Sequence, residues 1–474
     1  MYKYLLCWRY LLTRYLAIAC IISVMLGVAT LIVVNSVMSG FSTKLKDRLH
    51  GLLSDVLLEA RNGGEFLNPE EKMAAIRKSP VGNEIEAMTP VLEVFAMLQF
   101  PTSAGMSAKP VRLIGVDPEG RSKVGGFAEH LVFQKGSAQP SFKLNAEAKA
   151  RHDQRERQQA ILDMQRNSDF HPGADGLPPP APPPNAIKDP EGVIVGYAIA
   201  NFHYRDPNAP PDQQTKEFRA LSPGDDVILT TISGQKLVPV YDRFTICDYF
   251  RSEMSEYDAN YVFVPLKYLQ EMRATPDQVS GIQIRLKDYR KAKEVTEALA
   301  KLFPGETGYK VETWEDKQGP LLAAIRVERG LLNVLLFMIV GVAGFGILAI
   351  FTMIVVEKTK DIGILKALGA SNTGVMKIFL GYGLLLGLVG DLLGTVLGLA
   401  FTERINEIEK LLAKITGQDI FPRDIYYFDR IPTDIQTWSV LFVNFGAVAI
   451  AVLFSILPAL HAARLQPVKA LRYE

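Results

Sequence analysis

Four long apolar runs interrupt a chain whose polarity is otherwise mixed. They are Leu16–Met38, Leu331–Val356, Ile378–Phe401 and Ile435–Leu460. A helix needs about 20 apolar residues to cross a bilayer, and glycine-rich uncharged runs of this length rarely form the core helices of soluble proteins. The first run also exceeds the apolar region of a typical signal peptide, which has about 7–15 residues. The pattern therefore predicts four transmembrane helices.

Lysine and arginine in the short flanks predict the orientation, because these residues tend to stay in the cytoplasm. They gather before the first run, between the second and third runs, and in the tail, whereas the connection before the last run is mainly acidic. We expect 1–15, 357–375 and 461–474 in the cytoplasm, and 39–330 and 402–434 outside it. Both termini are then cytoplasmic.

The residues between the first and second runs have the pattern of a mixed α/β domain. Short segments rich in Val, Ile and aromatic residues predict strands, and two segments with helical spacing predict helices. The predicted strands are Asp55–Ala60, Pro90–Phe100, Val111–Asp117, Val193–Tyr197, Asp226–Ile232, Leu237–Ile246, Tyr261–Pro265 and Gly281–Leu286, and the predicted helices are Pro69–Lys78 and Ala292–Leu302. We expect an α-helical membrane protein with a large two-lobed α+β extracytoplasmic domain between its first two spans.

Residues 137–189 depart from this pattern. The charged run AEAKARHDQRERQQ is followed by the proline-rich stretch HPGADGLPPPAPPPN. Prolines at this density favour the extended polyproline conformation and cannot pack as a core. We expect an exposed insertion or spacer, and a docking arm for an outer partner is the alternative.

Helical patterns extend beyond two of the apolar runs. After the first run, apolar residues recur at spacings of three and four at Met38, Phe41, Leu45 and Leu49. Before the second run, Gly319-Pro320 is typical of a helix start. A helix from there to Val356 would be roughly 55 Å long, against about 30 Å of hydrocarbon, with Gly330 as its weakest point.

Composition and motifs exclude several classes of function. The 52 basic and 51 acidic side chains give a net charge of +1, which does not indicate a nucleic-acid-binding protein. The sequence contains no G-x-x-x-x-G-K-[ST], H-E-x-x-H, C-x-x-C or G-x-S-x-G motif, and its 6 histidines are scattered. Only Cys247 lies in the expected outer domain, so no intrachain disulfide can form there. We expect no catalytic, cofactor or metal site in this chain.

Asp391 is the one charged residue inside a predicted span. An intramembrane carboxylate is a candidate functional group, for instance in a proton relay, but no partner for it is visible in the other spans. It could instead face an outer vestibule or a neighbouring helix. Glycines recur every four residues around it, at Gly383 and Gly387 and at Gly390, Gly394 and Gly398. These small residues predict close helix packing.

A short charged and apolar segment, EKTKDIGILKALGAS, joins the second and third runs. Its apolar positions are Ile362, Ile364, Leu365 and Leu368, and its charged positions include Lys358, Lys360, Asp361 and Lys366. The spacing predicts a short amphipathic helix along the membrane that ends at Gly369, with Ser371 or Asn372 starting the next helix. Lipid headgroups, the protein's own helix ends or a soluble cytoplasmic protein could cover its apolar face.

This segment and its surroundings resemble a known family. The stretch VVEKTKDIGILKALGASNTGVMKIFLGYGLLLGLVG resembles the FtsX-like permease domain of ABC transporters, and LPALHAARLQPVKALRYE is similar to the usual ending of that family. Further stretches resemble its lipoprotein-releasing (Lol-type) members more than its MacB-type efflux permeases: VNSVMSGFSTKLKDRLHGLLSDVLLEA, VRLIGVDPE, VSGIQIRLKD, VETWEDKQGPLLAAIRVERGLLNVLLF and DIYYFDRIPTDI. The resemblance covers nearly the whole chain except 137–189.

The resemblance implies a permease subunit of the bacterial inner membrane that releases lipoproteins toward a periplasmic carrier. Residues 331–474 would form the FtsX-like domain, and the chain would work with a second copy or a related permease on a dimeric cytoplasmic ATPase, which binds the ATP. Residues 357–375 would contain the helix that couples to this ATPase. The implied coupling residues are Glu357, Lys358, Asp361, Ile362, Leu365, Lys366, Leu368 and Gly369.

The resemblance also suggests a cargo site and two rival functions. Met38, Phe41, Leu45 and Leu49 are candidate contacts for acyl chains, and packing against the helix at 320–330 is the alternative. A MacB-like assembly for efflux or peptide export would need a tunnel-forming adaptor outside. An FtsX-like regulator would activate a cell-wall hydrolase and transport nothing, so lipoprotein sorting would not depend on it.

Overall fold

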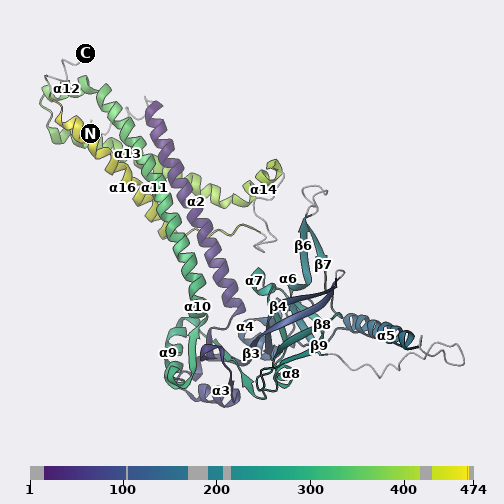
Figure 1. The fold of residues 1–474 in the computed structure, drawn as a ribbon. Helices are drawn as coiled ribbons and strands as arrows, with labels where there is room; N and C mark the ends of the chain where they lie inside the picture. The colour runs from purple at the N-terminus through teal and green to yellow at the C-terminus, as the bar shows by residue number, and fades with distance from the viewer. Residues whose placement is uncertain are drawn as a thin grey trace. The chain divides into compact units, whose positions relative to one another are not determined.

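The computed structural model describes residues 15–102, 105–168, 191–205, 215–416, 430–466 and 468. These residues form two compact units (Figure 1). The helical unit contains the described parts of 1–45, 320–421 and 429–474, and the α/β unit contains the described parts of 46–319. The predicted N-terminal segment, the proline-rich stretch and most of the tail after 466 lie outside the described residues.

Four long helices dominate the helical unit: α2 (Tyr15–Leu52), α11 (Gly319–Glu357), α13 (Asn372–Glu403) and α16 (Thr437–Arg464). Each is long and apolar enough to cross a membrane. Three of them, α2, α11 and α13, contain a whole predicted apolar run, whereas α16 begins two residues after the start of the predicted run Ile435–Leu460. The 39 residues of α11 are continuous through Gly330. At about 1.5 Å per residue α11 is nearly twice as long as the hydrocarbon core is thick.

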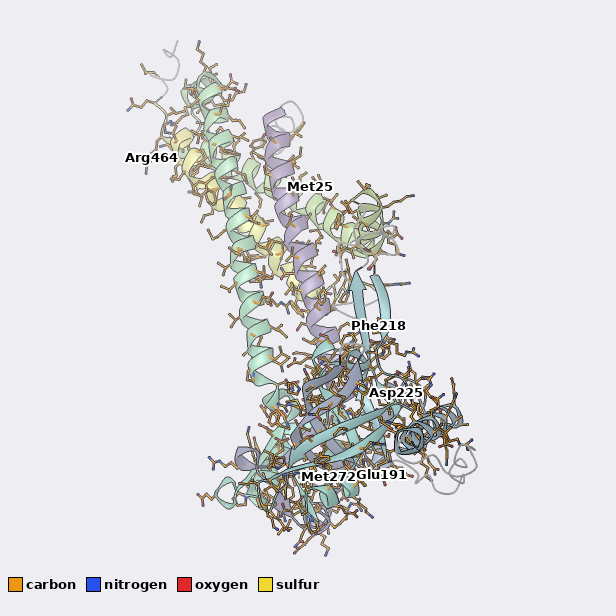
Figure 2. All side chains as sticks on the ribbon, turned by 45° about the vertical axis from the view of Figure 1, so that its right-hand side comes forward. Met25, Glu191, Phe218, Asp225, Met272 and Arg464 are labelled. Carbon is orange, nitrogen blue, oxygen red and sulfur yellow. The ribbon has the colours of Figure 1, made fainter. Side chains whose placement is uncertain are left out.

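Glycines bring α13 close to two neighbouring helices. A Cβ atom on Gly390 would lie 2.8 Å from Val24 Cβ, and one on Gly394 would lie 2.7 Å from the carbonyl oxygen of Met25, which is labelled in Figure 2. On another side of the helix, Gly383 faces Ser455 of α16. Gly387 faces Ala451 of α16 and Gly398 faces Ala29 of α2. Side chains at these positions would push the helices apart, so the glycines fix the spacing of α2, α13 and α16.

One mixed sheet runs through the α/β unit in the order β13-β1-β12-β3-β4-β10-β5-β9-β8, and β3 also pairs with β8. These strands are β1 (Val56–Ala60), β3 (Ile85–Thr102), β4 (Gly105–Val116), β5 (Gly192–Gly196), β8 (Asp226–Ile232), β9 (Pro239–Phe250), β10 (Tyr261–Pro265), β12 (Gly281–Leu286) and β13 (Tyr309–Thr313). The first half of β3 pairs with β12 and its second half pairs with β8. The pairing of β3 with β8 closes the strands from β3 to β8 into a barrel.

The α/β unit contains two hydrophobic cores. Inside the barrel, Leu92, Leu113 and Phe244 are fully buried. The second core lies between β13, β1 and β12 and two helices, α3 (Pro69–Lys78) and α9 (Ala292–Leu302), and includes Ile76 and Leu299. Short helices and strands complete the unit: β2 (Phe66–Leu67), α4 (Pro118–Gly125), α6 (Tyr197–Ala200), α7 (Ser255–Asp258), α8 (Leu266–Met272), β11 (Gln278–Val279) and α10 (Trp314–Lys317).

The predicted strands and helices of this unit are confirmed, and three of the strands (β8, β10 and β12) match at both ends. Several elements of the unit were not predicted, among them β2, β11, β13, α4 and α8. The charged run of the insertion forms a helix, α5 (Ala146–Ser168), and a separate hairpin joins β6 (Asn201–Arg205) to β7 (Thr215–Arg219).

The insertion is attached to the barrel at one end. On α5, His152 is buried with its Nδ1 atom 3.3 Å from Asp226, and Arg155 forms an ion pair with Asp225 at 2.8 Å. The expectation of an exposed insertion is therefore corrected for this part of α5, because its first turns are held against the start of β8.

Candidate functional site

The segment between α11 and α13 forms α12 (Thr359–Ala367), a helix of 9 residues. Gly369 follows it with a φ of +94°, which glycine adopts without strain, and the Ser371 side chain accepts a hydrogen bond from the Gly374 N–H at 3.1 Å. The predicted helix end at Gly369 and the predicted helix start at Ser371 are confirmed. Gly369 therefore ends α12, and Ser371 caps the start of α13.

The apolar positions of α12 lie on different surfaces. Ile362 is only 3% exposed and packs with Val355, Val375 and Ala462. Ile364 and Leu368 are 49% and 81% exposed. The expectation that Ile362 contacts a partner is corrected, because the protein's own helix ends cover its side chain.

The remaining predicted coupling residues also differ in their exposure to solvent. Leu365 is half-buried, whereas Glu357, Asp361 and Gly369 are exposed. Lys358 forms an ion pair with Asp361 at 2.6 Å. The free surface of α12 therefore combines an apolar pair, Ile364 and Leu368, with charged neighbours.

Lys366 fastens α12 to the end of α16. Its Nζ donates hydrogen bonds to the carbonyl oxygens of Ala463 at 2.7 Å and Leu465 at 2.6 Å. The last carbonyl groups of a helix lack partners within the helix and carry partial negative charge, so an ammonium group is favourable there. Lys366 therefore holds two helices of this chain together, which differs from the expected partner contact.

The apolar stripe on α2 is only partly accessible. Met38, Phe41 and Leu45 are half-buried, whereas Leu49 is fully buried. Leu49 therefore cannot line an open groove in this conformation, which corrects its assignment as an acyl-chain contact. The other three positions retain exposed apolar surface.

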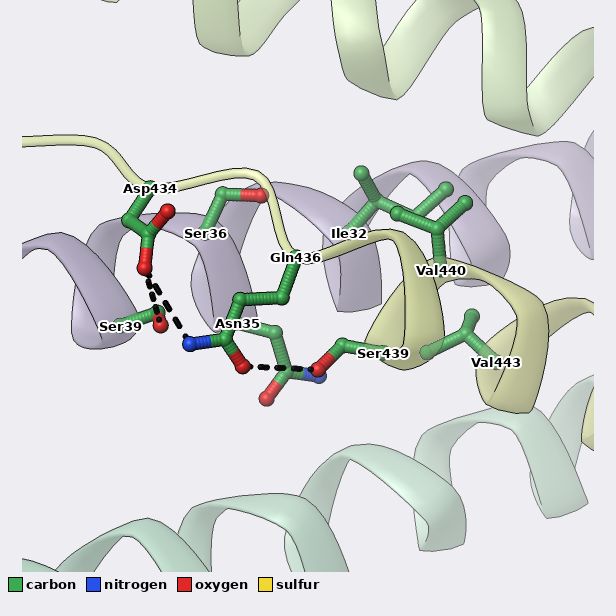
Figure 3. Close-up of a pocket in the computed structure, with 9 residues that line it drawn as sticks. All are labelled: Ile32, Asn35, Ser36, Ser39, Asp434, Gln436, Ser439, Val440 and Val443. Atoms are coloured by element: carbon green, nitrogen blue, oxygen red, sulfur yellow. Dashed lines mark hydrogen bonds between the residues drawn. The ribbon is translucent and has the colours of Figure 1, made fainter.

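Residues 430–436, which we call the crossing segment, run across α2 beside this stripe. The Asp434 N–H donates to the carbonyl oxygen of Ser36 at 2.9 Å, and the Asp434 carboxylate accepts hydrogen bonds from Ser39 at 3.1 Å and Thr43 at 3.3 Å. Figure 3 shows Asp434 between Ser39 and Gln436. The side-chain amide of Gln436 donates a hydrogen bond to the Asp434 carboxylate at 3.2 Å. The carboxylate thereby joins α2 to the residues that begin α16.

Close backbone contact accompanies these hydrogen bonds. A Cβ atom on Gly40 would lie 2.4 Å from the carbonyl oxygen of Pro432. The adjoining cavity has a volume of about 10 Å³, so it has room for about one water molecule and none for an acyl chain. The crossing segment is therefore a joint between helices. This joint was not predicted from the sequence, although a glycine near Ser39 and Thr43 on an apolar helix is a signal for such an approach.

Asp391 has a partner on the neighbouring helix. With the Asn444 side-chain amide oriented to satisfy both of its polar atoms, its nitrogen donates to Asp391 at 3.3 Å and its oxygen accepts from Thr395 at 3.2 Å. Asp391 and Thr395 lie on α13 and Asn444 lies on α16. Hydrogen bonds between membrane helices of this kind stabilise their association.

The α/β unit contains a cleft of about 500 Å³ on the outside of the sheet. Arg121 lines it and is buried; its guanidinium donates to the Leu52 carbonyl at 3.0 Å and to the Gln283 side chain. Burial lowers the pKa of Arg121 to about 10. Tyr257 and Tyr261 line the same cleft.

The hairpin of β6 and β7 exposes an aromatic pair. Phe202 and Phe218 lie opposite each other across the two strands, and both are exposed. Figure 2 labels Phe218 on this hairpin. No sequence motif had singled out either residue.

Within the described ranges, no group of three or more His, Cys, Asp or Glu side chains is placed to hold a metal ion.

Comparison with known proteins gives a consistent result. Residues 333–467 match the family of FtsX-like permease C-terminal domains. The lipoprotein-releasing system transmembrane protein LolC of Xylella fastidiosa (strain Temecula1) is 25% identical over 464 residues, which are 97% of this chain and 94% of that protein. LolE of Haemophilus influenzae is 30% identical over 215 residues, which are 45% of this chain and 51% of that protein.

Among solved structures, the periplasmic region of MacB from Actinobacillus actinomycetemcomitans covers 59% of this chain and 97% of its own chain. Its sequence identity to this chain is 12% and the TM-score is 0.28.

Proposed function

The chain is a Lol-type ABC transporter permease with an FtsX-like C-terminal domain, and from this premise we propose that it converts ATP hydrolysis by a separate ATPase into release of lipoproteins from the inner membrane. It is a multi-pass protein of the bacterial inner membrane. We further propose that both termini and α12 lie in the cytoplasm and that the α/β unit lies in the periplasm. ATP would bind only to the separate ATPase.

The observation that carries the proposal is the free surface of α12. Leu368 is 81% exposed on a helix that is capped at its end, packed on the protein through Ile362 and placed between two membrane-crossing helices. A large apolar side chain that is exposed beside charged groups is typical of a protein interface. We assign this surface, with Ile364 at its centre, to the cytoplasmic ATPase dimer.

Movement of α12 would reach the rest of the permease along two routes. The first is α11, which continues without interruption from Glu357 to Gly319, where the α/β unit begins. The second is the pair of hydrogen bonds from Lys366 to the end of α16. Transmission requires that these elements have two discrete arrangements, which ATP binding and release would alternately favour.

The cargo side of the proposal uses the accessible part of the α2 stripe. Met38, Phe41 and Leu45 would contact the acyl chains of a lipoprotein as it leaves the outer leaflet of the inner membrane. Acyl chains and half-exposed apolar side chains attract each other because contact removes both from water. The released cargo would pass to a soluble periplasmic carrier, and a second copy of the chain or a related permease would complete the transporter.

The decisive experiment is depletion of this chain in cells, followed by fractionation of lipoproteins between the inner and outer membranes. We expect lipoproteins to accumulate in the inner membrane. Unchanged sorting would reject the proposal and favour a regulator that transports nothing. Co-purification of a tunnel-forming adaptor in place of a soluble carrier would instead indicate efflux.

A variant pair tests the cargo contact separately. Phe41→Asp should reduce lipoprotein release by the reconstituted transporter, whereas Lys44→Asp, which introduces the same side chain at an exposed position of α2, should not. Normal release by a folded Phe41→Asp protein would show that the stripe on α2 does not contact the acyl chains of the cargo.

A further inference from the structure

The helix that follows α13 has an apolar face that the proposed function does not use. This helix, α14 (Ile405–Thr416), begins one residue after the end of α13. On its second half, Leu411 and Ile415 are 59% and 73% exposed, and Leu412 is also exposed. Three large apolar side chains on adjoining turns form a continuous patch, which needs a cover of lipid or protein.

The sequence of α14 gathers its large apolar residues on one side of the helix. At about 100° per residue, the apolar side chains fall within roughly 120° of the helix circumference. They are Ile405, Ile408, Leu411, Leu412 and Ile415. The opposite side carries Glu407, Lys410 and Lys414, which are exposed. This division, with lysines on the polar side, is typical of helices that lie in the surface of a membrane.

The start of α14 is fixed to the helical unit. The Asn406 side chain accepts a hydrogen bond from the Ile431 N–H at 2.8 Å and donates one to the Ile431 carbonyl at 3.4 Å. Ile431 belongs to the crossing segment, which is bound to α2 through Asp434. The first turn of α14 is thus held against the crossing segment, which is itself bound to α2.

Exposed apolar side chains also lie near the end of α13, just before α14 begins. Val396, Leu397 and Phe401 are exposed on the second half of α13. If α13 crosses the bilayer, these side chains face hydrocarbon, and the chain then passes through a single residue, Arg404, into α14. The phospholipid surface is therefore the apolar phase within reach of Leu411, Leu412 and Ile415.

We infer that α14 is an interfacial helix that inserts Leu411, Leu412 and Ile415 into the phospholipid surface at the end of α13. Lys410 and Lys414 then lie at the level of the lipid phosphate groups, and the lysine ammonium groups attract these phosphates. The inference rests on the membrane crossing of α13 in the proposed function. It adds a connection from the bilayer through α14 to the crossing segment, which lies beside the α2 stripe.

Quenching of an added tryptophan by brominated phospholipids tests this contact in the full chain. The protein is reconstituted with its ATPase into vesicles of phosphatidylcholine and phosphatidylglycerol, with bromine on the upper part of the acyl chains. Three variants are compared with the parent protein, whose 3 tryptophans supply the background signal. Ile415→Trp probes the apolar face of α14, Glu407→Trp probes its polar face, and Val396→Trp probes α13 inside the bilayer.

We expect strong quenching of the added signal in Ile415→Trp and Val396→Trp, and weak quenching in Glu407→Trp. Strong quenching at Val396 with weak quenching at Ile415 would overturn the interfacial helix and leave the membrane crossing of α13 intact. Weak quenching at Val396 would overturn the membrane assignment itself, and with it the inference. All three positions are exposed, so the substitutions add no volume to the core.

Discussion

Lys366 on α12 binds the carbonyl oxygen of Ala463 near the end of α16, with 2.7 Å between Nζ and the oxygen. The exposed surface of α12 and this contact lie on one short helix, so a partner that moves the surface also moves the contact. The last long helix is thus connected to α12 although nearly 100 residues of chain separate them.

Replacement of Lys366 by Met should uncouple ATP hydrolysis from lipoprotein release. The methionine keeps the apolar stem and loses two charge-assisted hydrogen bonds, each worth about 1.5–3 kcal/mol. We expect ATPase binding to persist and the amount of lipoprotein released per ATP hydrolysed to fall. Lys360→Met, at an exposed position of α12, is the matched control. Equal release per ATP in the two variants would show that Lys366 has no role in transmission.

Leu368→Glu should abolish co-purification of the ATPase and leave the permease folded in the membrane. The side chain is exposed, so a carboxylate there costs little in the isolated chain but would be buried unpaired in a complex. Ile362→Glu should behave differently, because this site is covered by the protein itself and the variant should lose stability. Retention of the ATPase by Leu368→Glu would place the interface elsewhere.

Gly40→Ala should destabilise the helical unit by about 1–3 kcal/mol, because the added methyl group would meet the backbone of Pro432, which cannot move aside as a side chain does. Gly330→Ala is the control. A Cβ at Gly330 meets nothing within 4 Å, and alanine is favoured over glycine inside a helix by about 0.5–1 kcal/mol. Thermal unfolding in detergent should shift in opposite directions, and a shared direction would contradict the close contact at Gly40.

Asp258 should make the stability of the α/β unit depend on pH. Burial raises its pKa from 3.8 to about 6. One carboxylate oxygen accepts two hydrogen bonds from Ser252, and the other has no partner among the described residues. A raised folded-state pKa means that the folded protein holds this proton more tightly than the unfolded chain does. The stabilisation, about 3 kcal/mol, is therefore complete below about pH 4 and is lost as the pH rises through 6.

Asp258→Asn isolates this contribution, because the amide has the shape of the protonated acid and does not titrate. Unfolding followed by the fluorescence of Trp314, which is buried in the same unit, should show that the variant gains stability over the parent protein between pH 4 and pH 7. A constant difference across this range would mean that Asp258 titrates normally.

The Asp391–Asn444 pair should contribute to the association of α13 with α16. Hydrogen bonds between membrane helices average about 0.6 kcal/mol in double-mutant cycles. A cycle of Asp391→Leu and Asn444→Leu should return a coupling of this order in unfolding experiments. If Asp391 also served transport, Asp391→Asn would reduce release without reducing stability; we expect release to be unchanged.

The sequence was sufficient for elements whose signals are local. Hydropathy located the four long helices, Gly369 located the end of α12, and Ser371 located the start of α13. Three strands could be bounded at both ends because Gly, Pro and Asp flank them. Local patterns carry this information because helix caps and strand alternation involve only neighbouring residues.

Features that depend on distant residues were missed or misassigned. The hydrophobic pattern of α12 grouped Ile362 with Leu368, and only the packing of Ala462 on Ile362 separates a buried residue from an exposed one. Asn444 lies 53 residues from Asp391, and a single polar residue in an apolar run has no visible partner until two helices are placed side by side. The charged start of α5 has the composition of an exposed helix, because its partners, such as Asp226, lie on a strand distant in the sequence.

The contacts at the two ends of α16 limit how this helix can move. Asp434 joins the residues before its first turn to α2, and Lys366 holds its last carbonyl groups. Because α16 is held at both ends, it cannot shift along its axis, and twisting and bending are the motions that these contacts allow. Pro458 lies inside the helix and has no N–H to complete the backbone ladder, so bending should concentrate in the turn before it.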